Sequence, residues 1–145
     1  MEQPKYKRVL LKISGEALAG DASRGLDFNV IGQVCEVIKE CTQLGVQVGV
    51  VVGGGNFWRG LKDGGDRMER VRADHMGMLA TSINALALAD SLEQQGVPTH
   101  FVEQLSERET VVKKVSIVPL EVIIRNISAG SFAKRYGVEE GIVFD

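Results

Sequence analysis

Residues 46–56 read Val-Gln-Val-Gly-Val-Val-Val-Gly-Gly-Gly-Asn, and this stretch decides the fold. Its β-branched residues predict a buried strand over Val46–Val52, which Gly53-Gly54-Gly55 end in a turn. A second apolar run, Val9–Ile13, is closed by Ser14-Gly15 in the same way. The sequence therefore predicts two short strands, each followed by a glycine turn.

Helical periodicity separates and follows the two strands. Asp27 suits the N-cap of a helix, apolar residues recur after it at helical spacing, and Gly45 stops it. A second helix is predicted from about Arg70 to Gln95, with loops over residues 16–26 and 60–68. The order strand, helix, strand, helix favours an α/β fold with a parallel sheet and covering helices.

Apolar side chains on the two helices supply the expected core. Met76, Met78 and Leu79 are predicted to be buried, and Cys35 and Cys41 are predicted to pack within the first helix. Two cysteines six residues apart do not form a disulfide scaffold, so a reducing compartment is the simpler interpretation.

The last third of the chain has a different residue pattern. A strand is predicted over residues 100–102 and a polar turn over residues 103–110. Residues 111–127 are rich in β-branched residues, and residues 129–136 predict one short helix that Gly137 stops. This part is expected to be β-rich with one short helix.

Polar and glycine residues gather where the two predicted strands end. Lys12, Ser14 and Gly15 bring a cation, a hydroxyl and a flexible turn to the first of these ends, where ligands of open α/β sheets bind. Glycines let backbone N–H groups approach phosphate oxygens, and Arg59 can add a forked contact. The alternative is a tight connection beside a solvated surface lysine, since neither glycine motif fits the Walker pattern.

Three residues near the glycine turns have two interpretations each. Asp74 either complements the dipole at a helix N-terminus or accepts hydrogen bonds from ligand hydroxyls. His75 is more often structural than catalytic, and Trp58 beside Arg59 either packs in its loop or covers a ligand or partner surface. The residues alone leave these alternatives open.

The composition of the 145-residue chain limits the function classes. It is 44% hydrophobic and 25% charged with a formal net charge of −2, so neither disorder nor electrostatic binding to nucleic acid or anionic membranes is indicated. No apolar run reaches the roughly 18 residues of a membrane span, and the start lacks a signal-peptide core, so we expect a cytoplasmic protein. Of the 17 glycines, 14 lie in residues 1–99, which sets this part apart from the rest.

Three ordered segments of the glycine-rich part resemble bacterial uridylate (UMP) kinase, of the amino acid kinase family. They are Tyr6–Leu18, Val50–Gly60 and Asp74–Thr81, and the resemblance covers about residues 1–99. It implies a partial three-layer αβα fold, a parent family that is hexameric, and transfer of the ATP γ-phosphate to UMP with Mg²⁺.

The same resemblance implies roles for individual residues. Lys12 is the implied catalytic cation, and residues 20–25 fall where the family has a GTP effector contact. The residues implied to bind ATP are Lys12, Ile13, Ser14, Gly15, Gly55 and Arg59. Those implied to bind UMP are Gly54 and Asp74, and no metal ligand in the chain is implied.

The last third of the chain resembles another family. The run Ile117–Ser131 and its continuation Phe132–Gly141 are similar to the signature of SAICAR synthetase, the purine-pathway ligase that uses ATP to join aspartate to a carboxyaminoimidazole ribotide. This resemblance places Arg125 and Ser131 at the phosphate of the ribotide, and Glu121 belongs to the same run without an assigned role.

The chain resembles only a part of each of the two enzymes, which leaves three hypotheses for its function. The expected domains are a kinase-like part, residues 1–95, and a ligase-like part, residues 96–145. The chain is a UMP kinase-like protein too incomplete for turnover, a fragment of SAICAR synthetase, or a non-catalytic chimera. Nucleotide binding separates these hypotheses, because only the first requires an ATP affinity that depends on Lys12.

Overall fold

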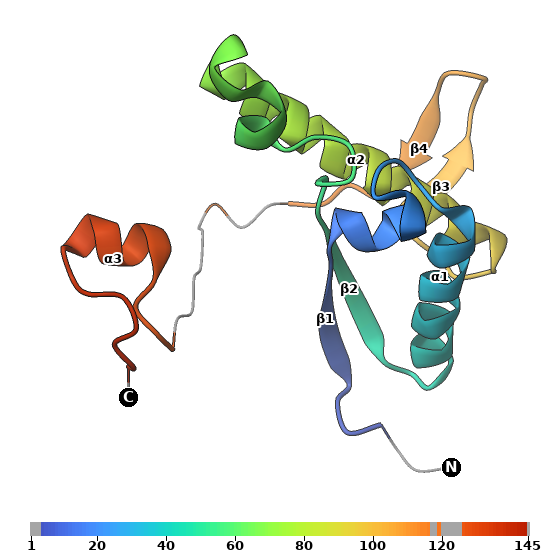
Figure 1. The fold of residues 1–145 in the computed structure, drawn as a ribbon. Helices are drawn as coiled ribbons and strands as arrows, with labels where there is room; N and C mark the ends of the chain where they lie inside the picture. The colour runs from blue at the N-terminus through green and yellow to red at the C-terminus, as the bar shows by residue number, and fades with distance from the viewer. Residues whose placement is uncertain (1–3, 117–118, 120–125, 145) are drawn as a thin grey trace. The chain divides into compact units, whose positions relative to one another are not determined.

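The computed structural model describes residues 4–116, 119 and 126–144 of the chain. It divides into two compact units, Met1–Lys113 and Lys114–Asp145, and each is described by itself. Figure 1 shows the first unit as a pair of strands with the helices α1 and α2 and a separate hairpin. The domain boundary expected from the sequence, between residues 95 and 96, stays a prediction.

The first unit is built on two parallel strands, as the sequence predicts. β1 (Arg8–Ile13) pairs with β2 (Gln47–Val52), with Val9 opposite Val48 along the register. A parallel pair needs a crossover connection, and α1 (Phe28–Gln43) lies in it. The predicted α/β class is therefore confirmed.

Local signals determine where the two long helices begin and end. The Asp27 carboxylate accepts hydrogen bonds from two N–H groups in the first turn of α1, at 2.9 and 3.3 Å, so the predicted N-cap is confirmed. Glu69 caps α2 (Arg70–Gln94) in the same way. Gly45 and Gly96 follow the two helices, each with a φ of +80° that glycine adopts without steric cost.

The core of this unit contains residues of the sheet, α1 and α2. Cys35 is fully buried in it as predicted, and burial raises the pKa of its thiol. Cys41 is only half-buried, and both cysteines are free. The buried members of the core are Ile13, Leu18, Ile31, Cys35, Ile38, Leu88, Leu92 and Val97.

Two segments predicted to be loops are helical, so that prediction is wrong. Gly15–Ala22 forms a 3₁₀ helix, η1, while Gly60–Gly64 and Gly65–Arg67 form two short helical turns, η2 and η3. Leu18 and Ala19 of η1 are buried, because this helix packs on α1 and α2. The small and polar residues around them show no helical periodicity, so this packing had no local signal.

Met76, Met78 and Leu79 lie outside the core, contrary to the prediction. Their side chains are 36%, 57% and 66% exposed. Apolar residues occur on several sides of α2, so periodicity did not identify the side that packs. The buried face of α2 instead carries Ala73, Ala80, Asn84, Leu88 and Leu92.

The first unit ends in an antiparallel hairpin. β3 (Phe101–Gln104) pairs with β4 (Thr110–Val112), so the predicted strand and turn are each displaced by one or two residues. Of the β-rich stretch 111–127, only the first two residues belong to a strand of this hairpin. Residues 117, 118 and 120–125 of that stretch lie outside the described residues.

The second unit contains one short helix, as the sequence predicts. α3 (Gly130–Tyr136) ends at Gly137, whose φ is +64°. Phe132 on this helix packs against Tyr136 and Phe144, with ring centroids 4.8 and 5.5 Å away. No helix in the described part of the chain is long and apolar enough to cross a membrane.

Candidate functional site

The turns that follow β1 and β2 lie directly against each other. The Gly53 N–H donates to the Ile13 carbonyl at 2.9 Å. Gly15 is buried, and a Cβ there would lie 2.5 Å from the Asn56 side chain and 2.7 Å from the Gly53 carbonyl. Only glycine fits this approach, so the glycines at the strand ends bring the two turns together.

A buried pair of amides holds the second turn on α2. Asn56 Nδ2 donates to Asn84 Oδ1 at 3.0 Å, and Asn84 Nδ2 donates to Asn56 Oδ1 at 2.7 Å. Asn84 Nδ2 also donates to the Gly53 carbonyl at 2.6 Å, and Asn56 Nδ2 to the Gly25 carbonyl at 2.7 Å. Both side chains are buried, so these bonds replace those that water would make.

Sequence reasoning missed Asn84 as a positioning residue. The signal was present, because Asn84 lies within residues 75–89 of α2, a stretch without any Asp, Glu, Lys or Arg. An amide that is buried in such surroundings needs a hydrogen-bonding partner. Asn56 supplies it, and the pair fixes the backbone that carries the next residues of the site.

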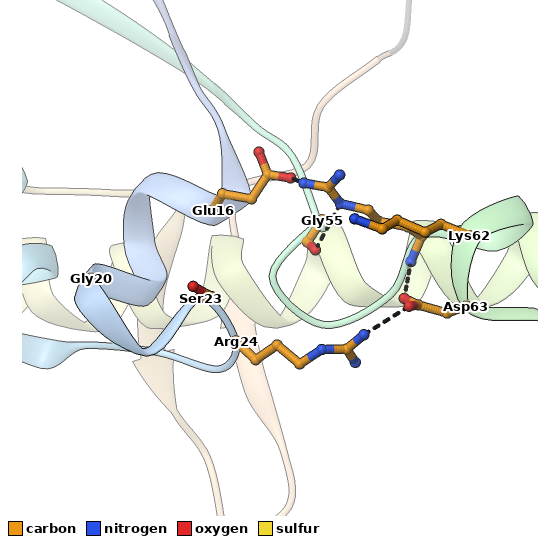
Figure 2. Close-up of a pocket in the computed structure, with 8 residues that line it drawn as sticks. Glu16, Gly20, Ser23, Arg24, Gly55, Lys62 and Asp63 are labelled. Atoms are coloured by element: carbon orange, nitrogen blue, oxygen red, sulfur yellow. Dashed lines mark hydrogen bonds and ion pairs between the residues drawn. The ribbon is translucent and has the colours of Figure 1, made fainter.

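A cavity of about 360 Å³ opens beside the two turns (Figure 2). Three of its lining residues are basic and two are acidic, so its wall carries a net positive charge. Such a wall suits a small anion or a phosphate-bearing ligand. The lining residues are Glu16, Gly20, Ser23, Arg24, Gly55, Arg59, Lys62 and Asp63.

Glu16 and Arg59 form one ion pair on the cavity wall. The other carboxylate oxygen of Glu16 accepts a hydrogen bond from Ser14 Oγ at 2.9 Å. Arg59 Nε also donates to the Gly55 carbonyl at 3.4 Å. The Glu16 carboxylate therefore engages a hydroxyl and a guanidinium that the kinase resemblance assigns to ATP phosphates.

Arg24 and Asp63 form the second ion pair, at 2.7 Å (Figure 2). Asp63 also accepts a hydrogen bond from the Arg59 backbone N–H at 2.8 Å. This backbone hydrogen bond and the neighbouring Arg24 lower the pKa of the Asp63 carboxyl. Because the folded-state pKa is depressed, the pair is fully formed above the ordinary pKa of aspartate and is lost as the pH falls through the depressed value.

Two ammonium groups near the turns are not paired in this way. Lys12 lies at the end of β1, opposite Val51, and its side chain is exposed. Within the described residues, no hydrogen bond or ion pair engages the ammonium of Lys12 or that of Lys62. Ile13 is buried in the core and its carbonyl accepts the Gly53 N–H, so its side chain does not face a ligand.

Gly54 and Asp74, which the resemblance assigns to UMP, are not among the lining residues of the cavity. A Cβ at Gly54 would lie 2.8 Å from the Ala80 Cβ, so this glycine lets the turn pack on α2. The Asp74 carboxylate forms an ion pair with Arg70 at 2.9 Å. Of the residues assigned to ATP, Gly55 and Arg59 line the cavity, whereas Lys12, Ile13, Ser14 and Gly15 are also not among its lining residues.

Three further features singled out from the sequence are Trp58, His75 and residues 20–25. Trp58 is half-buried, and its Nε1 donates to the Ala73 carbonyl at 2.9 Å, which favours packing over a free ligand cover. His75 is exposed on α2. Within residues 20–25, the cavity wall includes Gly20, Ser23 and Arg24.

The second unit holds the residues that resemble a ligase. Ser131 lies in the first turn of α3 and is exposed, while the Gly130 N–H donates to the Glu140 carboxylate at 2.7 Å. Arg125 and Glu121 lie outside the described residues. In the described part of the chain, no group of three or more His, Cys, Asp or Glu side chains is placed to hold a metal ion.

The first part of the chain has an α/β fold that resembles the amino acid kinase-like fold of UMP kinase. It is similar to UMP kinase from Bacillus anthracis, with a TM-score of 0.57 and 38% identity over 62% of this chain and 37% of that chain. It is also similar to UMP kinase from Ureaplasma parvum, with a TM-score of 0.59 and 40% identity over 66% of this chain and 42% of that chain. The chain thus covers well under half the length of these kinases.

The family model of SAICAR synthetase matches residues 65–145. This match spans more than half of the chain, so the chain belongs to the SAICAR synthetase family. Both resemblances found in the sequence are therefore confirmed, the kinase through solved structures and the ligase through its family model.

Replacing Asn84 tests whether the amide pair holds the site. We expect Asn84→Ala to lower the free energy of unfolding by about 2–3 kcal/mol, because the buried Asn56 Oδ1 and the partly buried Gly53 carbonyl each lose the donor that Asn84 supplies. Urea unfolding followed by circular dichroism measures this loss. Asn29→Ala, at an exposed asparagine of α1, is the matched control and should cost less than about 0.5 kcal/mol. Equal losses in the two variants would contradict the role of the pair.

Proposed function

We propose that the first part of the chain is a UMP kinase-like site that binds ATP and UMP without sustained phosphoryl transfer. The observation that carries this proposal is the cavity in which Arg24, Arg59 and Lys62 surround glycine backbone beside two strand-end turns. The similarity to UMP kinases supports the choice of nucleotides.

The phosphate contacts of ATP would use three kinds of donor. Arg59 offers a planar guanidinium that can contact two phosphate oxygens at once. Gly55 has no side chain to keep phosphate away from its backbone on the cavity wall. Lys12 brings a charge that no other described residue pairs to the end of β1, where it would neutralise a transferring phosphoryl group, since such transfer depends mainly on positioning and charge.

Mg²⁺ fits the site as a partner of bound phosphates. The ion prefers oxygen ligands, keeps several waters, and in kinase sites uses one or two carboxylates together with phosphate oxygens. Of the two carboxylates on the cavity wall, Asp63 would hold the ion there, while Glu16 is engaged by Ser14 and Arg59. Once bound, Mg²⁺ would neutralise charge on the β- and γ-phosphates.

We assign UMP to the surface that contains Gly54 and Asp74. The Asp74 carboxylate is suited to accept hydrogen bonds from ligand hydroxyls, and its exposed pair with Arg70 is weak enough to exchange for such a contact. Because the chain covers 37% and 42% of the two kinases, the other walls of a complete kinase site would have to come from outside it. We therefore expect binding without sustained turnover.

Titration with ATP tests the proposed site. We expect a Kd below ~1 mM, and at least about tenfold weaker binding for Lys12→Ala and Arg59→Ala, because each variant loses a cation that faces phosphate. Fluorescence of Trp58, the single tryptophan, reports binding next to Arg59. Lys39→Ala, an equal charge change on α1, should leave the Kd unchanged. Absence of ATP binding would refute the site, and sustained ADP release with UMP would refute the lack of turnover.

The Glu16 carboxylate is expected to compete with the phosphates of ATP. Glu16→Gln should tighten ATP binding about 2- to 5-fold. The wild-type carboxylate is bonded to Ser14 and Arg59, and this exposed ion pair of modest strength has to break before phosphate can bind them. The same titration measures this change, with Glu36→Gln on α1 as the control for net charge. Weaker binding in Glu16→Gln would show instead that the carboxylate supports the ligand or its metal ion.

A second candidate function is binding of an aminoimidazole ribotide by the ligase-like part, and the family match over residues 65–145 favours it. We assign the ribotide phosphate to Arg125 and Ser131. The Gly130 N–H now donates to the Glu140 carboxylate, and a phosphate would replace that carboxylate.

Calorimetric titration with an aminoimidazole ribotide tests this second candidate. Arg125→Ala is expected to weaken binding at least about tenfold, because a forked contact to phosphate is lost. Arg108→Ala, at an exposed arginine in the hairpin turn, is the matched control. Binding that survives Arg125→Ala unchanged would contradict the assignment.

A further inference from the structure

The first unit contains a second cavity, which lies between α1, β2 and α2. Its volume is about 150 Å³, and it shares no lining residue with the charged cavity beside the two turns. Seven of its eight lining residues are apolar and none is charged, so we call it the apolar pocket. The lining residues are Ile38, Val50, Val52, Ala85, Leu88, Ala89, Leu92 and Thr99.

The floor of the apolar pocket is buried and its mouth is open. Ile38, Leu88 and Leu92 are only 3%, 4% and 9% exposed and belong to the core. Close packing with the rest of the core holds these side chains in place, so they do not collapse into the cavity without cost. Val50 is 37% exposed and Ala85 is also exposed, so a ligand can enter from solvent on this side.

The one polar side chain of the pocket wall, that of Thr99, already has partners. Its hydroxyl donates to the Glu93 carboxylate and accepts a hydrogen bond from the Phe101 N–H at 3.3 Å. The Thr99 carbonyl accepts a hydrogen bond from the Lys113 ammonium at 2.9 Å. The apolar pocket therefore has no free polar side chain to offer a ligand.

A wall of this kind favours an apolar occupant over water. A water molecule in a cavity needs two to four polar partners, and the side chains of this wall supply none. A charged or hydrogen-bonding ligand would lose its own water there without a replacement. An apolar ligand loses no such bonds, and it gains dispersion contacts with Ile38, Leu88 and Leu92.

We propose that the apolar pocket is a binding site for a neutral hydrocarbon group of about six carbon atoms, of which a benzene ring is a simple example. The volume sets this size, because apolar cavities of about 150 Å³ stay free of water and bind benzene. The inference does not depend on ATP or UMP binding, because it uses no residue of the charged cavity.

Titration of the full chain with benzene, followed by the methyl signals in NMR spectra, tests this site. We expect saturable binding with a Kd of about 1 mM, and the largest shifts at Val50, Leu88 and Leu92. Pyridine has the same shape but a ring nitrogen that must lose its water, so it should bind at least about tenfold more weakly. Shifts that do not saturate, shifts centred on methyl groups outside the pocket, or equal affinity for pyridine would each overturn the proposal.

Filling the apolar pocket tests where benzene binds. Ala89→Leu should weaken binding at least about tenfold, because the added carbons occupy the cavity. Ala17→Leu, at an exposed alanine of η1, is the matched control and should leave the Kd unchanged. If circular dichroism shows that Ala89→Leu does not fold, Ala85→Leu at the exposed mouth decides, with the same loss expected.

Two results of these titrations would contradict the proposed occupant. The first is an unchanged affinity for benzene in a folded variant that fills the pocket. The second is a benzene affinity that falls as the protein concentration rises, because a side chain from a second copy would then compete for the same space. We expect neither result.

Discussion

The reciprocal hydrogen bonds between Asn56 and Asn84 are the contact on which the first unit depends. They fix the glycine turn after β2 to the middle of α2, and the missing side chain of Gly15 lets the turn after β1 reach the same place. Two strand ends are thereby held at one point. Because both amides are buried and hydrogen-bonded, the turn can move little. This fixes the positions of Gly55 and Arg59 on the cavity wall.

Two carboxylates balance two of the three cations on the cavity wall. Arg59 is paired with Glu16 and Arg24 with Asp63, so the folded chain does not bring bare like charges together. The Arg59–Glu16 pair is exposed on both sides, and such a pair is weak enough for a phosphate with higher charge to replace it. Lys12 remains outside these pairs, which leaves its charge available at the end of β1.

The parts of the fold with local causes were predictable from the sequence. The strands, the Asp27 cap and the glycine stops each follow from a few neighbouring residues, and each was found in place. The 3₁₀ helix at residues 15–22 was not predictable, because Leu18 is buried by contacts with α1 and α2 that lie far away in the chain. Asn84 had a local signal in its uncharged surroundings, but its partner is 28 residues away, so the sequence did not show what it bonds.

The failed core prediction on α2 has a physical cause. Periodicity reports that a side chain avoids water, and it does not report whether its own chain or another one covers it. Met76 and Leu79 carry the apolar signal of a core, while the folded unit buries smaller residues such as Ala80 on the opposite side. Ala80 is buried because the turn after β2 packs on it, with a Cβ at Gly54 only 2.8 Å from the Ala80 Cβ, so a small side chain and not a large apolar one is required there.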